Sequence, residues 1–257
     1  MRNRTGFKLH SFLCCLLFTI WTFHGVMAND HKTQQIFLST LKIAGLIGSS
    51  ADDKYTTLLN IAAQDHDARL VISEVPGNRL EHQFRMIGTG CIFPEYRAPE
   101  DADVVISHPF NQAPVHLVWR RGDHPPTTLE GLRVGLVKGY GYDFADFSNV
   151  KSITHVESER QNLLMLLFRR VDTILSYFPD LPLAANPGEI EKISYNARAP
   201  LHTSPERIAC FDTPENRAFL TSLNQTIARL EKSGELAEVL APYFYGLPED
   251  RQAAVKD

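Results

Sequence analysis

The segment 138–142, with the sequence Lys-Gly-Tyr-Gly-Tyr, has the residue types in this chain that best suit ligand binding. It follows an apolar run that ends at Val137 and leads to a polar segment at Asp143, where we expect a helix to begin. Glycine lets the backbone approach a ligand closely, and N–H groups at a helix start can face an anion. We interpret Gly139 to Gly141 as a ligand loop, with a purely structural turn as the alternative.

Aromatic side chains provide a second set of candidates, because tyrosine and tryptophan combine an apolar ring with a polar tip that can wall off a ligand. The candidates are Tyr140 and Tyr142 in the loop, Tyr177 after a later apolar run, and Trp119. Trp119 is better explained by packing in a connecting segment, so Tyr177 is the preferred candidate.

Charged and hydroxyl side chains supply further candidates. Arg97 and Arg79 could hold a carboxylate through the planar guanidinium, although a solvated surface position is the simpler interpretation of a single arginine. Ser49 and Ser50 follow the first expected strand and offer hydroxyl donors, with helix capping as the alternative.

Catalytic and metal-binding motifs are missing from the sequence. His108 and His116 lie eight residues apart in a segment expected to be extended, which does not make a tetrahedral zinc site without a partner. The chain has no Cys-x-x-Cys pair, no phosphate-binding loop with Lys-Ser/Thr and no Gly-x-Ser-x-Gly elbow. We therefore expect no catalytic residues, no metal and no cofactor.

The first 28 residues are typical of a secretory signal peptide. Three basic residues, Arg2, Arg4 and Lys8, precede an apolar stretch at 12–23, and small residues precede the expected cleavage near Ala28. An uncleaved anchor is the alternative. Cleavage would leave 23 basic and 30 acidic residues, a net charge of −7 in place of −4, which argues against nucleic acid or an anionic membrane as a partner.

Two cysteines remain after this cleavage, Cys91 and Cys210, and both lie in apolar runs typical of strands. An exported protein can form disulfides, so the pair is either a disulfide or two buried thiols.

Apolar periodicity predicts two α/β units that must position these candidates. The elements expected in the first unit are strands at 41–46, 70–72 and 88–93, and helices at 55–62 and 79–87. Those expected in the second, at about 122–196, are strands at 132–137 and 171–175 and a helix at 159–168. A last helix is capped by Thr213 before Pro214 and ended by Gly234, and a short one follows at 235–240. Without a flexible linker the units must pack directly, which leaves a cleft at the strand ends.

Segments 129–139, 169–175 and 233–244 together resemble the second lobe and final helices of the bacterial extracellular solute-binding protein family 3, and segment 106–110 resembles the family's first crossover. The family consists of two-lobed receptors for amino acids and related polar solutes. The resemblance implies an α/β, type 2 periplasmic binding protein-like fold, in which each lobe is a mixed sheet flanked by helices. It places lobe 1 at 29–118 and 198–257, and lobe 2 at 119–197.

The same resemblance implies which residues contact the ligand. It adds Ser107 and Lys138 to Ser49, Arg79, Arg97, Gly139, Tyr140 and Tyr177. Two family positions differ: Glu100 replaces the arginine that holds the ligand carboxylate, with Arg97 three residues earlier, and Tyr177 replaces the aspartate that pairs with the ligand ammonium. A standard α-amino acid is therefore not the expected ligand.

The expected function is that of a monomeric periplasmic binding protein, not an enzyme. It would close its lobes on a small polar solute and deliver it to the permease of an ABC importer. One alternative is a sensory module with the same fold that acts through a membrane sensor. The other is a dehydratase-like enzyme using Glu100, Asp172 and His108.

Overall fold

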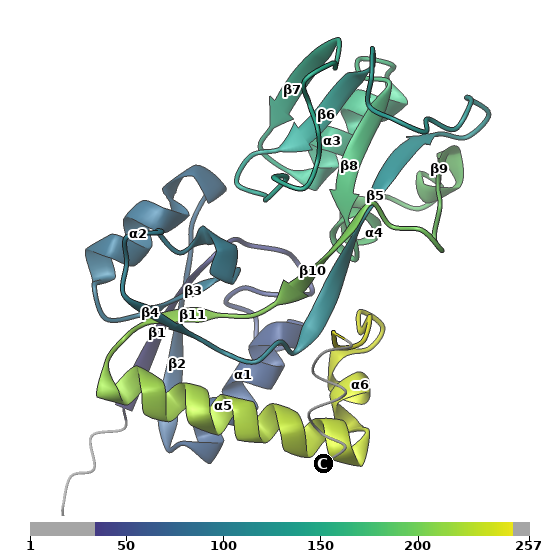
Figure 1. The fold of residues 1–257 in the computed structure, drawn as a ribbon. Helices are drawn as coiled ribbons and strands as arrows, with labels where there is room; N and C mark the ends of the chain where they lie inside the picture. Colours follow the sequence, from purple (N-terminus) through teal and green to yellow (C-terminus); the bar gives the residue numbers. More distant parts are fainter. Residues whose placement is uncertain (1–33, 249–257) are drawn as a thin grey trace, which may run out of the picture. The chain divides into compact units, whose positions relative to one another are not determined.

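The computed structural model describes residues 34–248, and the expected signal peptide lies outside them. The first sheet has five strands in the order β2-β1-β3-β11-β4 (Figure 1). They are β1 (Gln34–Thr40), β2 (Ala68–Glu74), β3 (Cys91–Phe93), β4 (Val104–Ile106) and β11 (Ala209–Phe211). β1 pairs in parallel with β2 and β3, whereas β11 is antiparallel to β3 and β4, so the sheet is mixed.

Helices cover this sheet and complete the first lobe. They are α1 (Lys54–Asp65), α2 (Leu80–Ile87), α5 (Pro214–Ser233) and α6 (Glu235–Leu240), with short 3₁₀ helices η1 (Gly77–Arg79) and η2 (Glu95–Arg97). The hydroxyl of Thr213 accepts a hydrogen bond from the Asn216 N–H at 3.1 Å and caps α5. Gly234, with φ of 84°, ends it, as expected from the sequence. Leu58, Phe219 and other apolar residues of α1 and α5 form the core of this lobe.

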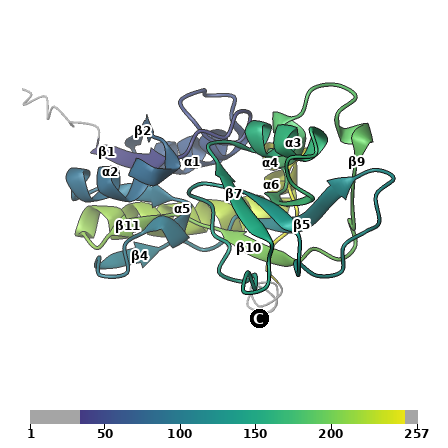
Figure 2. The same cartoon turned by 90° about the horizontal axis from the view of Figure 1, so that it is seen from above.

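The second sheet has the strand order β10-β5-β8-β6-β7, with β9 paired to β5. These strands are β5 (Asn111–Arg120), β6 (Arg133–Val137), β7 (Ser152–Val156), β8 (Thr173–Tyr177), β9 (Ile193–Tyr195) and β10 (His202–Glu206). The helices are α3 (Glu159–Leu167), α4 (Asp180–Ala184) and the 3₁₀ helix η3 (Ile190–Lys192). β6 is parallel to β7 and β8, and β5 is antiparallel to β8 and β10. Figure 2 shows helices α3 and α4 near the strands of this sheet.

Two adjacent segments connect the sheets: the segment between β4 and β5, and the segment between β10 and β11. The Ser107 N–H donates to the Ile208 carbonyl at 2.9 Å, and the Phe110 N–H donates to the Glu206 carbonyl at 3.0 Å. The chain thus crosses between lobes twice, with both crossings hydrogen-bonded to each other. The lobe boundaries expected at 118/119 and 197/198 stay predictions.

Two expected elements are absent from the structure. Residues 41–46, expected as the first strand, follow β1 as a turn, because Gly45 has a φ of 80° and the Leu46 N–H bonds to the Ile43 carbonyl at 2.9 Å. The helix expected at Asp143 is a turn in which the Ala145 N–H bonds to the Tyr142 carbonyl at 3.0 Å. The second difference removes the helix N-terminus that we expected to face an anion.

Cys91 and Cys210 lie opposite each other in β3 and β11, and their sulfur atoms are joined as a disulfide. Both side chains are fully buried in the first lobe. The bond links two strands that are 119 residues apart in the sequence.

Candidate functional site

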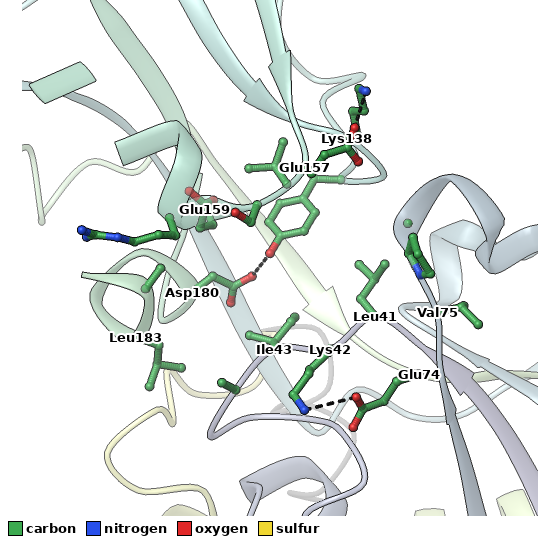
Figure 3. Close-up of a pocket in the computed structure, with 18 residues that line it drawn as sticks. Leu41, Lys42, Ile43, Glu74, Val75, Lys138, Glu157, Glu159, Asp180 and Leu183 are labelled. Atoms are coloured by element: carbon green, nitrogen blue, oxygen red, sulfur yellow. Dashed lines mark hydrogen bonds and ion pairs between the residues drawn. The ribbon is translucent and has the colours of Figure 1, made fainter. Parts of the chain in front are cut away.

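An outer cavity of about 650 Å³ lies between the two lobes (Figure 3). Its lining comprises residues 41–44 after β1, 74–77 around the end of β2, Val137, Lys138 and Tyr140 around the end of β6, 157–160 before and in α3, and Asp180, Leu183 and Ala184 of α4. Strand ends from both sheets therefore converge on it, which is where open α/β sheets bind ligands.

The cationic side chains that line the outer cavity already have acidic partners. Lys42 forms an ion pair with Glu74 at 3.3 Å, and Lys138 forms one with Glu157 (Figure 3). Arg160 pairs with Glu189, which lies between α4 and η3. Each of these three cations is therefore already paired with a carboxylate of the protein.

Glu74 is further held by the first lobe. The Ser49 N–H donates to its Oε1 at 2.5 Å, and this hydrogen bond lowers the pKa of Glu74, with Lys42 adding to the effect. Ionised Glu74 thus stays beside Lys42 over the neutral pH range.

Within residues 34–248, the carboxyl groups of Asp180 and Glu159 in the second lobe are buried and have no cationic partner. Asp180 accepts a hydrogen bond from the Tyr140 hydroxyl at 2.6 Å, and burial raises its pKa to about 6. Glu159 accepts one from the Ser176 hydroxyl at 2.9 Å, and burial together with the charge of Asp180 raises its pKa to about 8. Both groups line the outer cavity.

An inner cavity of about 20 Å³ adjoins the outer one and shares with it Leu41, Ile43, Tyr140 and Asp180. Its other lining residues are four aromatic ones, Tyr55, Phe93, Tyr96 and Tyr177, together with Leu46, Pro94, Ala113, Pro179 and Glu206. The hydroxyl of Tyr177 donates to the Gly141 carbonyl at 2.5 Å.

Glu206, at the end of β10, is the second acid of the inner cavity and is only 7% exposed. Burial raises its pKa well above the usual range, and the charges of Asp180 and Glu95 add to this. Over residues 34–248, no side chain donates a hydrogen bond to this carboxyl group.

The lobes touch beside the cavities. A Cβ at Gly77 of the first lobe would lie 3.1 Å from the Cα of Gly139 in the second. A Cβ at Gly141 would lie 3.2 Å from the ring of Tyr96. Gly77 and Gly139 therefore meet backbone to backbone with no room for a Cβ, whereas Gly141 packs against the ring of Tyr96.

The structure brings together four of the candidates proposed from sequence. Lys138 and Tyr140 line the outer cavity, Tyr140 and Tyr177 line the inner one, and Gly139 makes the contact between lobes. Gly139 therefore shapes the site through packing on Gly77, a different role from the anion contact suggested by the sequence.

The other four candidates line neither cavity. Ser49 reaches Glu74 through its backbone N–H and also through its side chain, and both lower the pKa of that carboxyl group, while Arg79 is exposed in η1. The Nη2 of Arg97 donates to the Gly77 carbonyl at 3.2 Å, and the Ser107 hydroxyl accepts from the Ile208 N–H at 3.1 Å. Arg97 and Ser107 thus support the lobe contact and the crossing respectively.

Sequence reasoning missed the acids of both cavities. Asp180 follows the expected strand 171–175 closely, so its position after a strand end was an available signal. Glu206 lies in β10, a strand that apolar periodicity does not reveal because its sequence is His-Thr-Ser-Pro-Glu.

Neither a metal site nor a membrane span is found in the described part of the chain. No group of three His, Cys, Asp or Glu side chains there could hold a metal ion. No helix there has the length and hydropathy of a transmembrane segment. Among the acid–base candidates, Asp172 is bound to Arg133 at 2.7 Å, and neither Glu100 nor His108 lines the two cavities.

No family model matches the chain, and no curated protein is similar to it in sequence. Solved structures with the same fold include the substrate-binding protein of an amino acid ABC transporter (TM-score 0.64, 13% identity, 82% of this chain and 100% of that chain). Another is an arginine third transport system periplasmic binding protein from Legionella pneumophila (0.63, 14%, 82% and 100%). A third is the GluR0 ligand-binding core from Nostoc punctiforme in complex with L-glutamate (0.65, 15%, 82% and 100%).

These similarities confirm the expected fold class. The chain has the two-lobed type 2 periplasmic binding protein fold, with two mixed sheets flanked by helices. The substrate-binding protein of an amino acid ABC transporter and the arginine periplasmic binding protein named above have the same fold, as the resemblance in sequence implied. At 13–15% identity the similarity concerns the fold, and the ligands named belong to those proteins.

Proposed function

We propose that this chain is a periplasmic solute-binding protein that captures a small polar solute by closing its lobes and delivers it to the permease of an ABC importer. The observation that supports this most directly is the cavity of about 650 Å³ at the strand ends of both lobes. Its volume is that of a typical small-molecule site. The proposal includes export through a signal peptide at residues 1–28, lobes at 29–118 with 198–257 and at 119–197, and a monomeric receptor.

The arrangement of charges favours binding over catalysis. The lining lysines are held in ion pairs, and the buried carboxyl groups of Asp180 and Glu159 accept hydrogen bonds from the hydroxyls of Tyr140 and Ser176. Such groups can select and orient a solute by charge and hydrogen bonding. A hinge at the two crossings would let the lobes separate and close around it.

The test is thermal melting of the purified protein with a panel of amino acids, amines, small carboxylates and short peptides. A ligand that binds only the folded state at 100 times its Kd stabilises by about 2.7 kcal/mol, or roughly 5–10 °C for a protein of this size. Small-angle scattering with the same ligand should show a more compact protein.

Two variants, each with tryptophan in place of an exposed alanine, locate the binding site. Ala44 lines the outer cavity and is exposed, so Ala44→Trp should fill the cavity and abolish the shift without unfolding the protein. Ala51 is equally exposed but lines neither cavity, so Ala51→Trp should retain the shift. Failure of every compound in the panel to stabilise the protein, or equal effects of the two variants, would refute the proposal.

A further inference from the structure

The geometry points to a ligand that is an organic amine without an α-carboxylate, with its primary ammonium group bound in the inner cavity between Asp180 and Glu206. This inference rests on the proposed function, because the ligand must enter the same cleft. It goes further by assigning the charge of the ligand and the residues that recognise it.

The first argument is the state of Glu206. Its side chain is more than nine-tenths buried and lines the inner cavity, and no side chain in residues 34–248 donates to it. A buried polar group without a partner is costly, so such groups in folded proteins normally have a hydrogen-bond donor. A ligand ammonium, with three donors, would supply it.

The second argument is the other acid of the inner cavity. Asp180 comes from α4 of the second lobe, while Glu206 comes from the crossing strand β10, and both line the same space. The protein supplies two donors to Asp180, the Tyr140 hydroxyl and the backbone N–H of Asp180 itself, and both are neutral. A ligand cation between these acids would therefore meet two carboxyl groups and no protein cation.

The walls and size of the inner cavity suit an ammonium group. Aromatic rings surround it, with Tyr140 and Tyr177 edge to face at 5.3 Å and Tyr55 and Phe93 at 5.6 Å. Aromatic faces attract cations. The volume of about 20 Å³ is near the minimum for one water molecule, which fits a primary ammonium and excludes the larger guanidinium or trimethylammonium.

The third argument is the absence of a partner for an α-carboxylate. Lys42, Lys138 and Arg160 are the cationic residues lining the two cavities, and each is already paired with an acid. Against these three cations the same cavities have five acids: Glu74, Glu157, Glu159, Asp180 and Glu206. An amino acid would have to share one of these cations with the protein carboxylate already paired to it.

Four probes that differ in one charged group test this inference in calorimetric titrations: n-butylamine, 1,4-diaminobutane, L-norvaline and butanoate. L-Norvaline is n-butylamine with an added α-carboxylate. We expect both amines to bind, L-norvaline to bind at least about tenfold more weakly than n-butylamine, and butanoate not to bind. Tighter binding of L-norvaline or butanoate than of n-butylamine would overturn the inference.

Two isosteric variants test the assigned residues. Glu206→Gln and Asp180→Asn should each weaken 1,4-diaminobutane binding at least about tenfold, because each removes a buried negative charge. Glu238→Gln removes an exposed carboxylate of α6 and should leave the affinity unchanged. If neither variant folds, the titrations of the wild-type protein with the four probes still test whether the ligand is an amine. Unchanged amine affinity in a folded Glu206→Gln protein would refute the site.

The outcomes separate this inference from the proposed function. Stabilisation and closure by an anion or an α-amino acid, with no response to amines, would leave the receptor proposal intact and refute the amine ligand. No response to any solute in either experiment would refute both.

Discussion

Gly139 makes the contact between lobes that can be tested most directly by substitution. A Cβ at this residue would lie 2.8 Å from the Cα of Gly77 and 3.1 Å from its carbonyl carbon. Both atoms belong to backbone, which cannot turn aside as a flexible side chain can. Gly139→Ala should therefore hinder the lobes from reaching the arrangement seen here.

Gly131 provides a matched control. Both glycines have positive φ, 85° at Gly139 and 69° at Gly131, so alanine at either site costs about 1–3 kcal/mol of backbone strain. A Cβ at Gly131, however, meets no atom within 4 Å. The difference between the two variants isolates the contact with Gly77.

The magnitude follows from the contact distance. Ordinary Cβ contacts begin at 3.4 Å, so the two backbones in Gly139→Ala would have to separate by about 0.6 Å. Overpacking of this kind typically costs about 1–3 kcal/mol. If the cost falls on the closed arrangement alone, the Kd of a ligand identified in the melting panel rises about 5- to 150-fold relative to Gly131→Ala.

Calorimetric titration of wild type and both variants gives the three Kd values, and thermal melting without ligand checks that both variants fold. We expect similar melting temperatures for Gly139→Ala and Gly131→Ala, but weaker binding by Gly139→Ala. Ligand affinities of the two variants within twofold of each other would show that the Gly77 contact plays no part in binding.

Two further predictions concern stability. Reduction of the Cys91–Cys210 disulfide, which joins residues 119 apart, should lower the free energy of unfolding by about 2–5 kcal/mol and the melting temperature by roughly 4–20 °C. Calorimetry with and without dithiothreitol measures this change. An unchanged melting temperature would indicate that the two cysteines are free thiols. The raised pKa of Glu159, about 8 against an ordinary 4.5, means that the folded state retains a proton lost on unfolding, so this group's contribution to stability falls as pH rises from about 5 to 8. The unfolding free energy of Glu159→Gln relative to wild type should therefore rise over that range by up to about 1.4 kcal/mol per pH unit in urea titrations, and a constant difference would contradict the buried neutral acid.

Elements whose signals are local in sequence could be predicted well. α5 has a capping threonine, a first-turn proline, an apolar face and a terminal glycine, and the structure places it at Pro214–Ser233. Helices α1 and α2 and strands β2 and β6 were likewise evident from periodicity.

The segment 41–46 shows where periodicity misleads. Its two end residues are buried as in a strand, since Leu41 and Leu46 are at most 7% exposed. Yet they are buried by a turn at Gly45, which is fixed by a hydrogen bond from its N–H to the Asp53 side chain at 2.9 Å. Burial alone does not distinguish a strand from a turn that folds back on the core. The true first strand, β1, begins in a more polar sequence and was missed.

The site was predicted where its residues follow a strand end and missed where it depends on tertiary contacts. Lys138, Tyr140 and Tyr177 lie at or after the ends of β6 and β8, which sequence can locate. Asp180 and Glu206 meet only because β10 crosses back beside β5, a pairing between residues some ninety positions apart in the chain. A single glutamate in a polar segment gives no sequence signal of such a pairing.

The charges of the cleft support selection of solutes by the sign of their charge as well as by their shape. The lysines that line the outer cavity are neutralised by Glu74 and Glu157, whereas the inner acids Asp180 and Glu206 have raised pKa values because they are buried. A cation entering the inner cavity would replace the protons on these acids with its own charge, so the buried carboxylates would gain a partner. An anion would gain no free cation and would keep the acids protonated. Burial makes the carboxyl groups of the empty site costly to ionise, and it therefore favours a positively charged ligand.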